Sequence, residues 1–143
     1  MQKTEWQIGT HYALGAKAFS KEEIFEFAKS HDPLDFHLNM KAANNSRFKG
    51  LVCSGGQAFY YFYPKAWVPK FGKTVVAGMG LKEWNFLAPI YVNETISANC
   101  EIRNIKNAKK NDEVIIDWFF EFKNESGKLV QSLHLTVLHK RIK

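Results

Sequence analysis

Cysteine is scarce in this sequence: Cys53 and Cys100 are the only two among its 143 residues. Both lie in apolar stretches, and two thiols are too few for a disulfide framework or a cysteine-rich metal cluster. We therefore expect both to be buried, unpaired thiols. Cys53 has no base beside it in the sequence, which argues against a role as a nucleophile.

Long hydrophobic runs are also missing. No apolar stretch approaches the ~18 residues that a membrane-spanning helix requires, and residues 1–7 lack the charged-then-apolar pattern of a signal peptide. We therefore predict a cytoplasmic protein that makes no membrane contact. The sequence contains no metal, flavin or nicotinamide signature either, so we expect no cofactor.

The composition is that of one globular domain spanning residues 1–143. Apolar residues make up 45% of the chain and aromatic residues 15%, and this length suffices for one core but not for two. The net charge of +6 favours an anionic ligand. No basic run with interleaved aromatic residues is present, so we do not expect that ligand to be nucleic acid.

A strand and two helices are predicted near the start of the chain. Residues 10–19 predict a strand that leads into a helix, and Ser20 forms a capping box with Glu23 at the start of that helix. The helix should end near Ser30. Residues 39–45 predict another short helix.

The apolar segment 54–63 indicates a helix that is buried on every side. Pro64 should end this helix, and a loop should follow through Gly72. A sheet wrapped around the helix would provide the burial that it needs.

From residue 74 onward the pattern is extended. Apolar and polar residues alternate with a period of two, as they do in half-buried strands. The predicted strands are residues 74–86, 95–103, 114–122 and 129–138, with turns at 104–112 and 124–127. Helices followed by antiparallel strands predict an α+β domain with one curved sheet.

A carboxylate and an imidazole, those of Asp32 and His37, stand five residues apart on either side of Pro33. Proline fixes its own φ and biases the preceding residue away from helical conformations, so the helix should end here in a stiff loop. Such a loop can aim two proton-transfer groups at one small volume. The same residues also fit an ordinary turn, in which the Asp side chain binds nearby amides and the His has no chemical role.

Ser54, Gly55 and Gly56 precede the apolar helix. Backbone N–H groups at the start of a helix are unpaired and carry partial positive charge, so they can hold an oxyanion. Gly55 has no side chain and would let a substrate come close. Acid, base and a place for negative charge would then lie within one segment.

Three segments resemble the MaoC-like dehydratases, also called R-specific enoyl-CoA hydratases. Residues 27–39 carry that family's Asp-x-x-x-x-His signature in its Asp-Pro-x-x-Phe-His form. Residues 47–55 resemble its Phe-Gly-Gly-Leu-Ile-Ala-Ser-Gly block, and residues 80–96 resemble its strand ending in Pro-Val-x-x-Gly-Asp-Thr-Leu. The three blocks occur in the family's order and cover most of the chain. The resemblance implies the hot-dog fold, in which a curved antiparallel sheet wraps around a long central helix.

The resemblance also implies a reaction: hydration of trans-2-enoyl thioesters, or the reverse dehydration of (R)-3-hydroxyacyl thioesters. Asp32 and His37 would together activate the water, and the amide of Gly55 would polarise the thioester carbonyl. Which group protonates carbon is left open. Ser54 stands where His is common in the family, and Tyr63 is expected to line or flank the acyl tunnel.

Three further residues depart from the family pattern. Asp35 stands where Pro or Asn is usual, and it either raises the proton affinity of Asp32 or is solvated, the second interpretation being favoured. We expect His31 to be an exposed helix end. Asn93 replaces a turn glycine, which is tolerable because Asn accepts the left-handed conformation.

The family's substrates are carried by coenzyme A or by the phosphopantetheine of an acyl carrier protein, both of which are anionic. We interpret the basic cluster of Lys106, Lys109 and Lys110 as a solvated turn and assign it no phosphate contact. Hot-dog chains bury a sheet edge or a helix face against a second copy. We therefore expect a homodimer with the active site at its interface, or a hexamer.

Two other functions remain open. A hot-dog acyl-CoA thioesterase would place a catalytic carboxylate on or beside the central helix, but no Asp or Glu lies between Ser54 and Lys82. A non-catalytic acyl-thioester binding module would be favoured if Asp32 and His37 did not face each other.

Overall fold

The computed structural model describes residues 6–142 of the chain. Residues 1–5, which include most of the stretch searched for a signal peptide, lie outside this part. None of the helices within residues 6–142 is both long and apolar enough to cross a membrane. The elements, in chain order, are β1 (His11–Ala18), α1 (Lys21–His31), α2 (Asp35–Leu38), α3 (Met40–Asn45), α4 (Gln57–Phe62), η1 (Tyr63–Trp67), α5 (Val68–Phe71), η2 (Gly72–Thr74), β2 (Val75–Phe86), β3 (Thr95–Asn107), β4 (Glu113–Lys123) and β5 (Leu129–Lys140).

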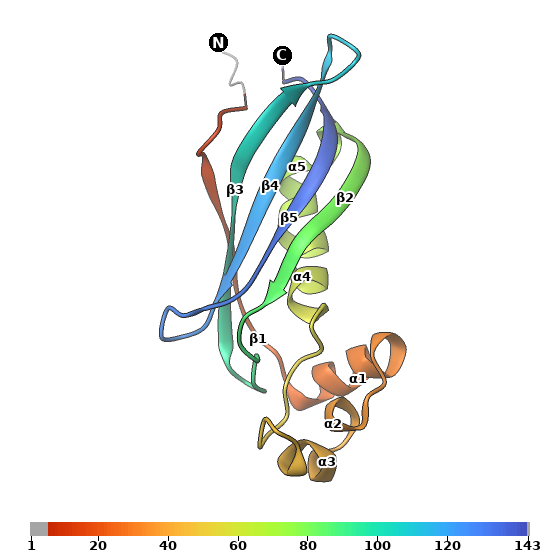
Figure 1. The fold of residues 1–143 in the computed structure, drawn as a ribbon, viewed down its shortest axis with the longest axis vertical. Helices are drawn as coiled ribbons and strands as arrows, with labels where there is room; N and C mark the ends of the chain where they lie inside the picture. Colours follow the sequence, from red (N-terminus) through yellow and green to blue (C-terminus); the bar gives the residue numbers. More distant parts are fainter. Residues whose placement is uncertain (1–5, 143) are drawn as a thin grey trace.

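One five-stranded antiparallel sheet forms the body of the molecule, with the strand order β1-β3-β4-β5-β2. Along much of β3 and β4 alternate side chains are buried, as the period of two predicted. The helical segment from α4 to α5 runs along one face of the curved sheet, and α1 to α3 lie beyond one end of it (Figure 1). The predicted α+β hot-dog fold is therefore confirmed.

The central helix is longer than predicted. It continues from α4 through the π-helical segment η1 and α5 to Phe71, so the expected end at Pro64 and the loop after it are wrong. Pro64 lies in the first turn of η1, where the N–H of Val68 bonds the carbonyl of Tyr63, five residues back. Inside a continuous helix a proline removes one backbone hydrogen bond and crowds the carbonyl four residues before it, and the wider π turn lets the chain continue past it.

The same helix is not buried on every side, so that expectation is wrong along one edge. Phe59 and Phe62 lie in the core, whereas Tyr60 is 54% exposed. Tyr60 lines an open cavity of about 630 Å³ between α1 and α4. The helix therefore has an inner face against the sheet and one side that the chain itself leaves uncovered.

The predicted start and end of α1 are confirmed. The hydroxyl of Ser20 accepts a hydrogen bond from the N–H of Glu23 at 3.1 Å, and the Glu23 carboxylate accepts one from the N–H of Ser20 at 2.9 Å. The helix ends at His31, with Asp32 as its C-cap in a non-helical conformation. α3 starts after Asn39, whose side chain caps it.

The predicted left-handed conformation of Asn93 and the solvated lysines are observed, but the turn predicted at 104–112 is shorter, because β3 continues to Asn107. Asn93 has a φ of 62°, in the left-handed region. Lys106, Lys109 and Lys110 are exposed. They lie at or beside the turn between β3 and β4, at the end of the sheet opposite α1 to α3 (Figure 1).

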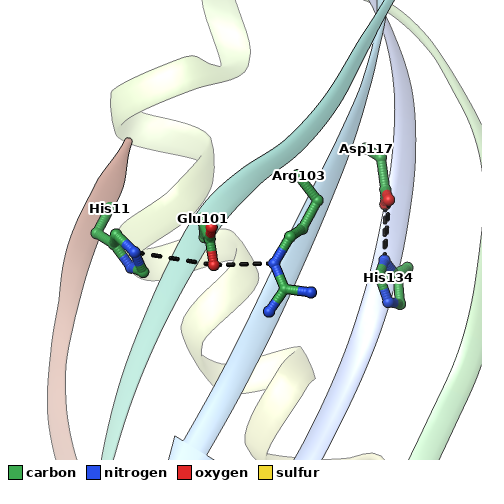
Figure 2. Close-up of polar contacts among 5 residues, drawn as sticks. All are labelled: His11, Glu101, Arg103, Asp117 and His134. Atoms are coloured by element: carbon green, nitrogen blue, oxygen red, sulfur yellow. Dashed lines mark hydrogen bonds and ion pairs between the residues drawn. The ribbon is translucent and has the colours of Figure 1, made fainter. Parts of the chain in front are cut away.

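A row of polar side chains crosses the face of the sheet that points away from the helix (Figure 2). The Glu101 carboxylate lies between His11 Nε2, at 3.8 Å, and Arg103 Nε, at 2.9 Å. His134 Nδ1 lies 3.0 Å from the Asp117 carboxylate. The contacts of His11 with Glu101 and of Asp117 with His134 join neighbouring strands, so we assign this row to the stability of the sheet.

Candidate active site

Asp32 and His37 lie side by side where α1 gives way to α2. The Oδ2 atom of Asp32 is 3.4 Å from Nε2 of His37. Only 5% of His37 is exposed, whereas 35% of the Asp32 side chain is. The imidazole is therefore fixed in the interior, and the carboxylate beside it opens towards solvent.

His37 lies on a helical turn, not in the plain loop that was predicted. The four residues of α2 begin just after Leu34, whose carbonyl accepts the N–H of His37 at 2.9 Å. A single turn is too short to produce a recognisable apolar period, which is why the sequence pattern missed it. The turn orients the imidazole towards the interior.

The backbone carbonyl of Val52 fixes the tautomer of His37. Nδ1 of His37 lies 2.9 Å from this oxygen, and because a carbonyl can only accept, Nδ1 must carry the hydrogen. Neutral His37 then has its lone pair on Nε2, the nitrogen that faces Asp32. The segment around Val52 is itself held in place, since the N–H of Cys53 donates to the carbonyl of Ile90 at 2.8 Å.

Gly55 and His37 line the same cavity, which has a volume of about 340 Å³. Within the described residues, no backbone acceptor or side chain takes the N–H of Gly55. The cavity's other lining residues are Phe36, Phe48, Val52, Cys53, Phe86, Leu87, Ala88, Pro89, Ile90 and Gln131. The arrangement thus places a buried imidazole and a free amide around one mostly apolar space.

Position 55 has room for a side chain only if the ring of Phe86 moves. A Cβ atom built on Gly55 would lie 2.7 Å from Cζ of Phe86, a distance at which something must move. Phe86 is 58% exposed, so its ring is not locked by the core. The glycine therefore allows close approach of an aromatic ring, or of a ligand in its place, to the backbone.

Ser54 and Tyr63 occupy different surroundings from each other. The Ser54 hydroxyl is buried beside Gly55 and has no hydrogen-bond partner among residues 6–142. Tyr63 is half-buried and stacks between Phe59 and Trp67, with ring centroids 5.2 and 5.3 Å away. The structure places His37 and Gly55 on one cavity and Asp32 in contact with His37, whereas Asp32, Ser54 and Tyr63 line neither of the two cavities described above.

Asp35 and His31 are both exposed, which agrees with the solvated interpretation of each. Both cysteines are free and buried, as predicted. Burial raises the pKa of the Cys53 thiol to about 12, and the negative charges of Glu23 and Glu94 act in the same direction. Cys53 lines the cavity but stays protonated at neutral pH, so it is a poor nucleophile.

Sequence reasoning missed the cavity walls supplied by Phe36, Phe48, Phe86 and Gln131. The aromatic residues gave no signal, because apolar residues at these positions fit an ordinary core. Gln131 did give one, since it is polar at a position of β5 where the next three alternate residues, Leu133, Leu135 and Val137, are apolar.

The central helix itself lacks the carboxylate of a thioesterase, although Glu22, Glu23 and Glu26 of α1 line the cavity beside it. Across Gln57–Phe62 and on to Phe71 the central helix carries no carboxylate. The Gln57 side chain, at the start of this helix, is an amide, and its Nε2 donates to the carbonyl of Glu23 at 3.1 Å. This bond ties the central helix to α1.

Comparisons with known proteins show the family of this chain. The sequence profile of the family described as "MaoC like domain" matches residues 3–117. The uncharacterised protein YdeM of Bacillus subtilis is 27% identical over 143 residues, which cover 99% of this chain and 100% of that protein.

Solved structures share the fold. The crystal structure of a MaoC-like dehydratase from Rhodospirillum rubrum superposes with a TM-score of 0.84 at 23% identity, covering 95% of this chain and 94% of the other. An (R)-hydratase from A. caviae, involved in PHA biosynthesis, superposes with a TM-score of 0.71 at 19% identity, covering 92% and 96%.

Proposed function

This chain belongs to the MaoC-like domain family, and on that premise we propose that it hydrates trans-2-enoyl thioesters, or dehydrates (R)-3-hydroxyacyl thioesters in reverse. The observation that carries the proposal is the contact of Asp32 with His37, which lines one cavity together with Gly55. The (R)-hydratase of A. caviae, whose fold is similar, supports the choice of reaction.

The separation of Asp32 and His37 suits a shared water. At 3.4 Å the two groups are too far apart for a good hydrogen bond. A water beside them can donate one hydrogen to the carboxylate and the other to the lone pair on Nε2, which leaves its oxygen free to attack. The bond of Nδ1 to Val52 keeps Nε2 available for this role.

In the hydration direction, the water oxygen bonds to the β-carbon while one of its protons passes to the pair of Asp32 and His37. Charge then develops on the thioester oxygen, where the amide of Gly55 stabilises it. A proton returns to the α-carbon, so that H and OH are added across the double bond. The free N–H of Gly55 supports this assignment.

The thioester is carried by coenzyme A or by the phosphopantetheine of an acyl carrier protein. Both handles are anionic, which suits a chain with a net charge of +6. The exposed lysines beside the turn between β3 and β4 lie at the other end of the sheet from α2, the helix that carries His37, and take no part in this proposal (Figure 1).

The working form is a homodimer. β2 lies at the edge of the sheet, and its row of unpaired backbone groups can pair with another strand. Large apolar side chains are exposed on it or just after it: Val76, Met79, Leu81, Phe86 and Leu87. Because Phe86 and Leu87 also line the cavity, a partner at this edge would complete the wall of the site.

The activity is tested with trans-2-enoyl-CoA esters of increasing chain length. Loss of the enoyl thioester absorbance without release of free thiol supports hydration. Release of free thiol supports a thioesterase instead. If the folded dimer shows neither reaction at any chain length, hydration of coenzyme A thioesters is contradicted. Enoyl thioesters of an acyl carrier protein are then assayed in the same way.

A further inference from the structure

Gln131 and His139 are the two polar residues in the inward-pointing series of β5, and of these only His139 has a hydrogen-bond partner on each of its side-chain polar atoms among the described residues. The inward-pointing residues between them, Leu133, Leu135 and Val137, are buried and apolar. In register, Gln131 lies opposite Phe122 on β4 and Phe86 on β2. Gln131 is therefore flanked by an aromatic residue on each neighbouring strand, and it lines the cavity that His37 also lines.

The amide of Gln131 is buried without a full set of partners. Only 3% of the residue is exposed, and its Oε1 atom makes no hydrogen bond to any residue within 6–142. An unpaired polar atom in such surroundings destabilises the fold, so it calls for an explanation. Gln131 lines the same cavity as His37 and Gly55, and a ligand in that cavity can supply the missing bond.

The remaining walls narrow the choice of ligand. Besides Gln131 and His37, the cavity is lined by apolar and aromatic side chains, the Cys53 thiol and the Gly55 backbone. Its volume of about 340 Å³ is near the lower end of the roughly 300–1,000 Å³ of ligand pockets. An unsubstituted alkyl chain would fill this space but leave the Gln131 amide unpaired.

We infer that Gln131 is a specificity-determining residue that binds a hydroxyl group on a short acyl chain. The inference rests on the proposed function, and it narrows the substrate to short enoyl thioesters with a hydroxyl beyond the double bond. A hydroxyl both donates and accepts, so it pairs with the amide in either of its two orientations. A site built around such a bond rejects the analogue that lacks the hydroxyl.

The test compares matched ligands in the full-length protein. Binding of saturated acyl-CoA esters of four to six carbons, with and without a terminal hydroxyl, is measured by calorimetry in the Asp32→Asn variant and in Asp32→Asn with Gln131→Met. We expect the hydroxylated ester to bind about tenfold more tightly, the difference that one hydrogen bond of ordinary strength supplies. Gln131→Met should abolish this preference, whereas Leu133→Met, a buried control on the same face of β5, should retain it.

Equal binding of the two esters, an unchanged preference in Gln131→Met, or no binding of either ester would overturn the inference. Turnover is then measured in the wild type with the corresponding enoyl esters. Hydration without a preference for the hydroxylated ester removes the role of Gln131 but leaves the proposed function standing. A preference in binding without any hydration supports the role of Gln131 but contradicts the proposed function. The two failures can therefore be told apart.

Discussion

Gly55 is the residue whose replacement should separate activity from folding. A methyl group at this position would meet only the end of the exposed Phe86 side chain, which can move away. We expect Gly55→Ala to fold with a stability close to that of the wild type but to lose about 10²-fold in kcat, because the methyl group obstructs access to the oxyanion amide. Thermal unfolding and enoyl-CoA turnover measure the two effects.

Gly56→Ala is the matched control, since its methyl group would have no contact closer than 3.4 Å. It should keep most of the activity. The double variant Gly55→Ala/Phe86→Ala removes the ring that the new methyl group would meet. Recovery of wild-type activity in the double variant would show that the clash with Phe86, and not access to the amide, explains the loss.

His139 gives a pH dependence that belongs to folding and not to catalysis. It is fully buried; Nε2 accepts the indole N–H of Trp118 at 3.0 Å, and Nδ1 contacts the hydroxyl of Thr74 at 2.8 Å. Burial lowers its pKa from 6.5 to about 4. The unfolded chain therefore binds a proton more readily, and the free energy of unfolding should fall as the pH drops from 6.5 towards 4.

The full effect of such a shift is about 3 kcal/mol. Chemical denaturation between pH 7 and 4 should show this decline in the wild type, and His139→Gln should remove most of the slope. His11→Gln, at the exposed edge of the sheet, should leave the slope as it is. An unchanged slope in His139→Gln would mean that other groups cause the acid sensitivity.

The sequence predicted the proposed acid and base residues but not their geometry. Asp32, His37 and Gly55 were predicted because their residue types and spacing fit a known chemistry. The direction of the imidazole depends on the carbonyl of Val52, fifteen residues away along the chain. Gln131 lies still further along the chain, and its role depends on a cavity that forms only when β5 packs beside the start of the central helix.

At the scale of single elements, the capping box of α1 should contribute measurably to stability. Loss of the Ser20 hydroxyl leaves the N–H of Glu23 without its acceptor. We expect Ser20→Ala to lower the free energy of unfolding by about 1 kcal/mol. Urea denaturation provides the measurement, and Ser30→Ala, an exposed serine on the same helix, is the control that should stay within about 0.5 kcal/mol of the wild type. Equal losses in the two variants would contradict the capping role.

The elements were predictable where local rules decide them. The alternation of apolar and polar residues in strands and the capping box at Ser20 are both patterns within a few residues, so β3, β4 and α1 were recognised. The path through Pro64 was not, because it depends on a π turn that packs Trp67 into the core. Tertiary packing overrode the usual effect of proline there.

At the scale of the whole molecule, the exposed edge at β2 predicts self-association. Met79 is 55% exposed near the middle of this strand, and a charge there would be buried in a dimer that forms through β2. We expect sedimentation velocity to show a dimer for the wild type and a shift towards monomer for Met79→Glu. Met40→Glu, on α3, should leave the dimer intact. A wild-type monomer at tens of micromolar concentration would contradict this assembly.

The central claim is that Asp32 and His37 act together on one water, and matched kinetics test it most directly. With the best trans-2-enoyl-CoA ester, kcat should fall by about 10²-fold or more in both Asp32→Asn and His37→Gln, the contribution expected of proton-transfer groups. Asp35→Asn, which alters an exposed carboxylate three residues away, should stay close to the wild type. Circular dichroism confirms that each variant is folded. Activity within a few-fold of the wild type in either Asp32→Asn or His37→Gln would contradict the account.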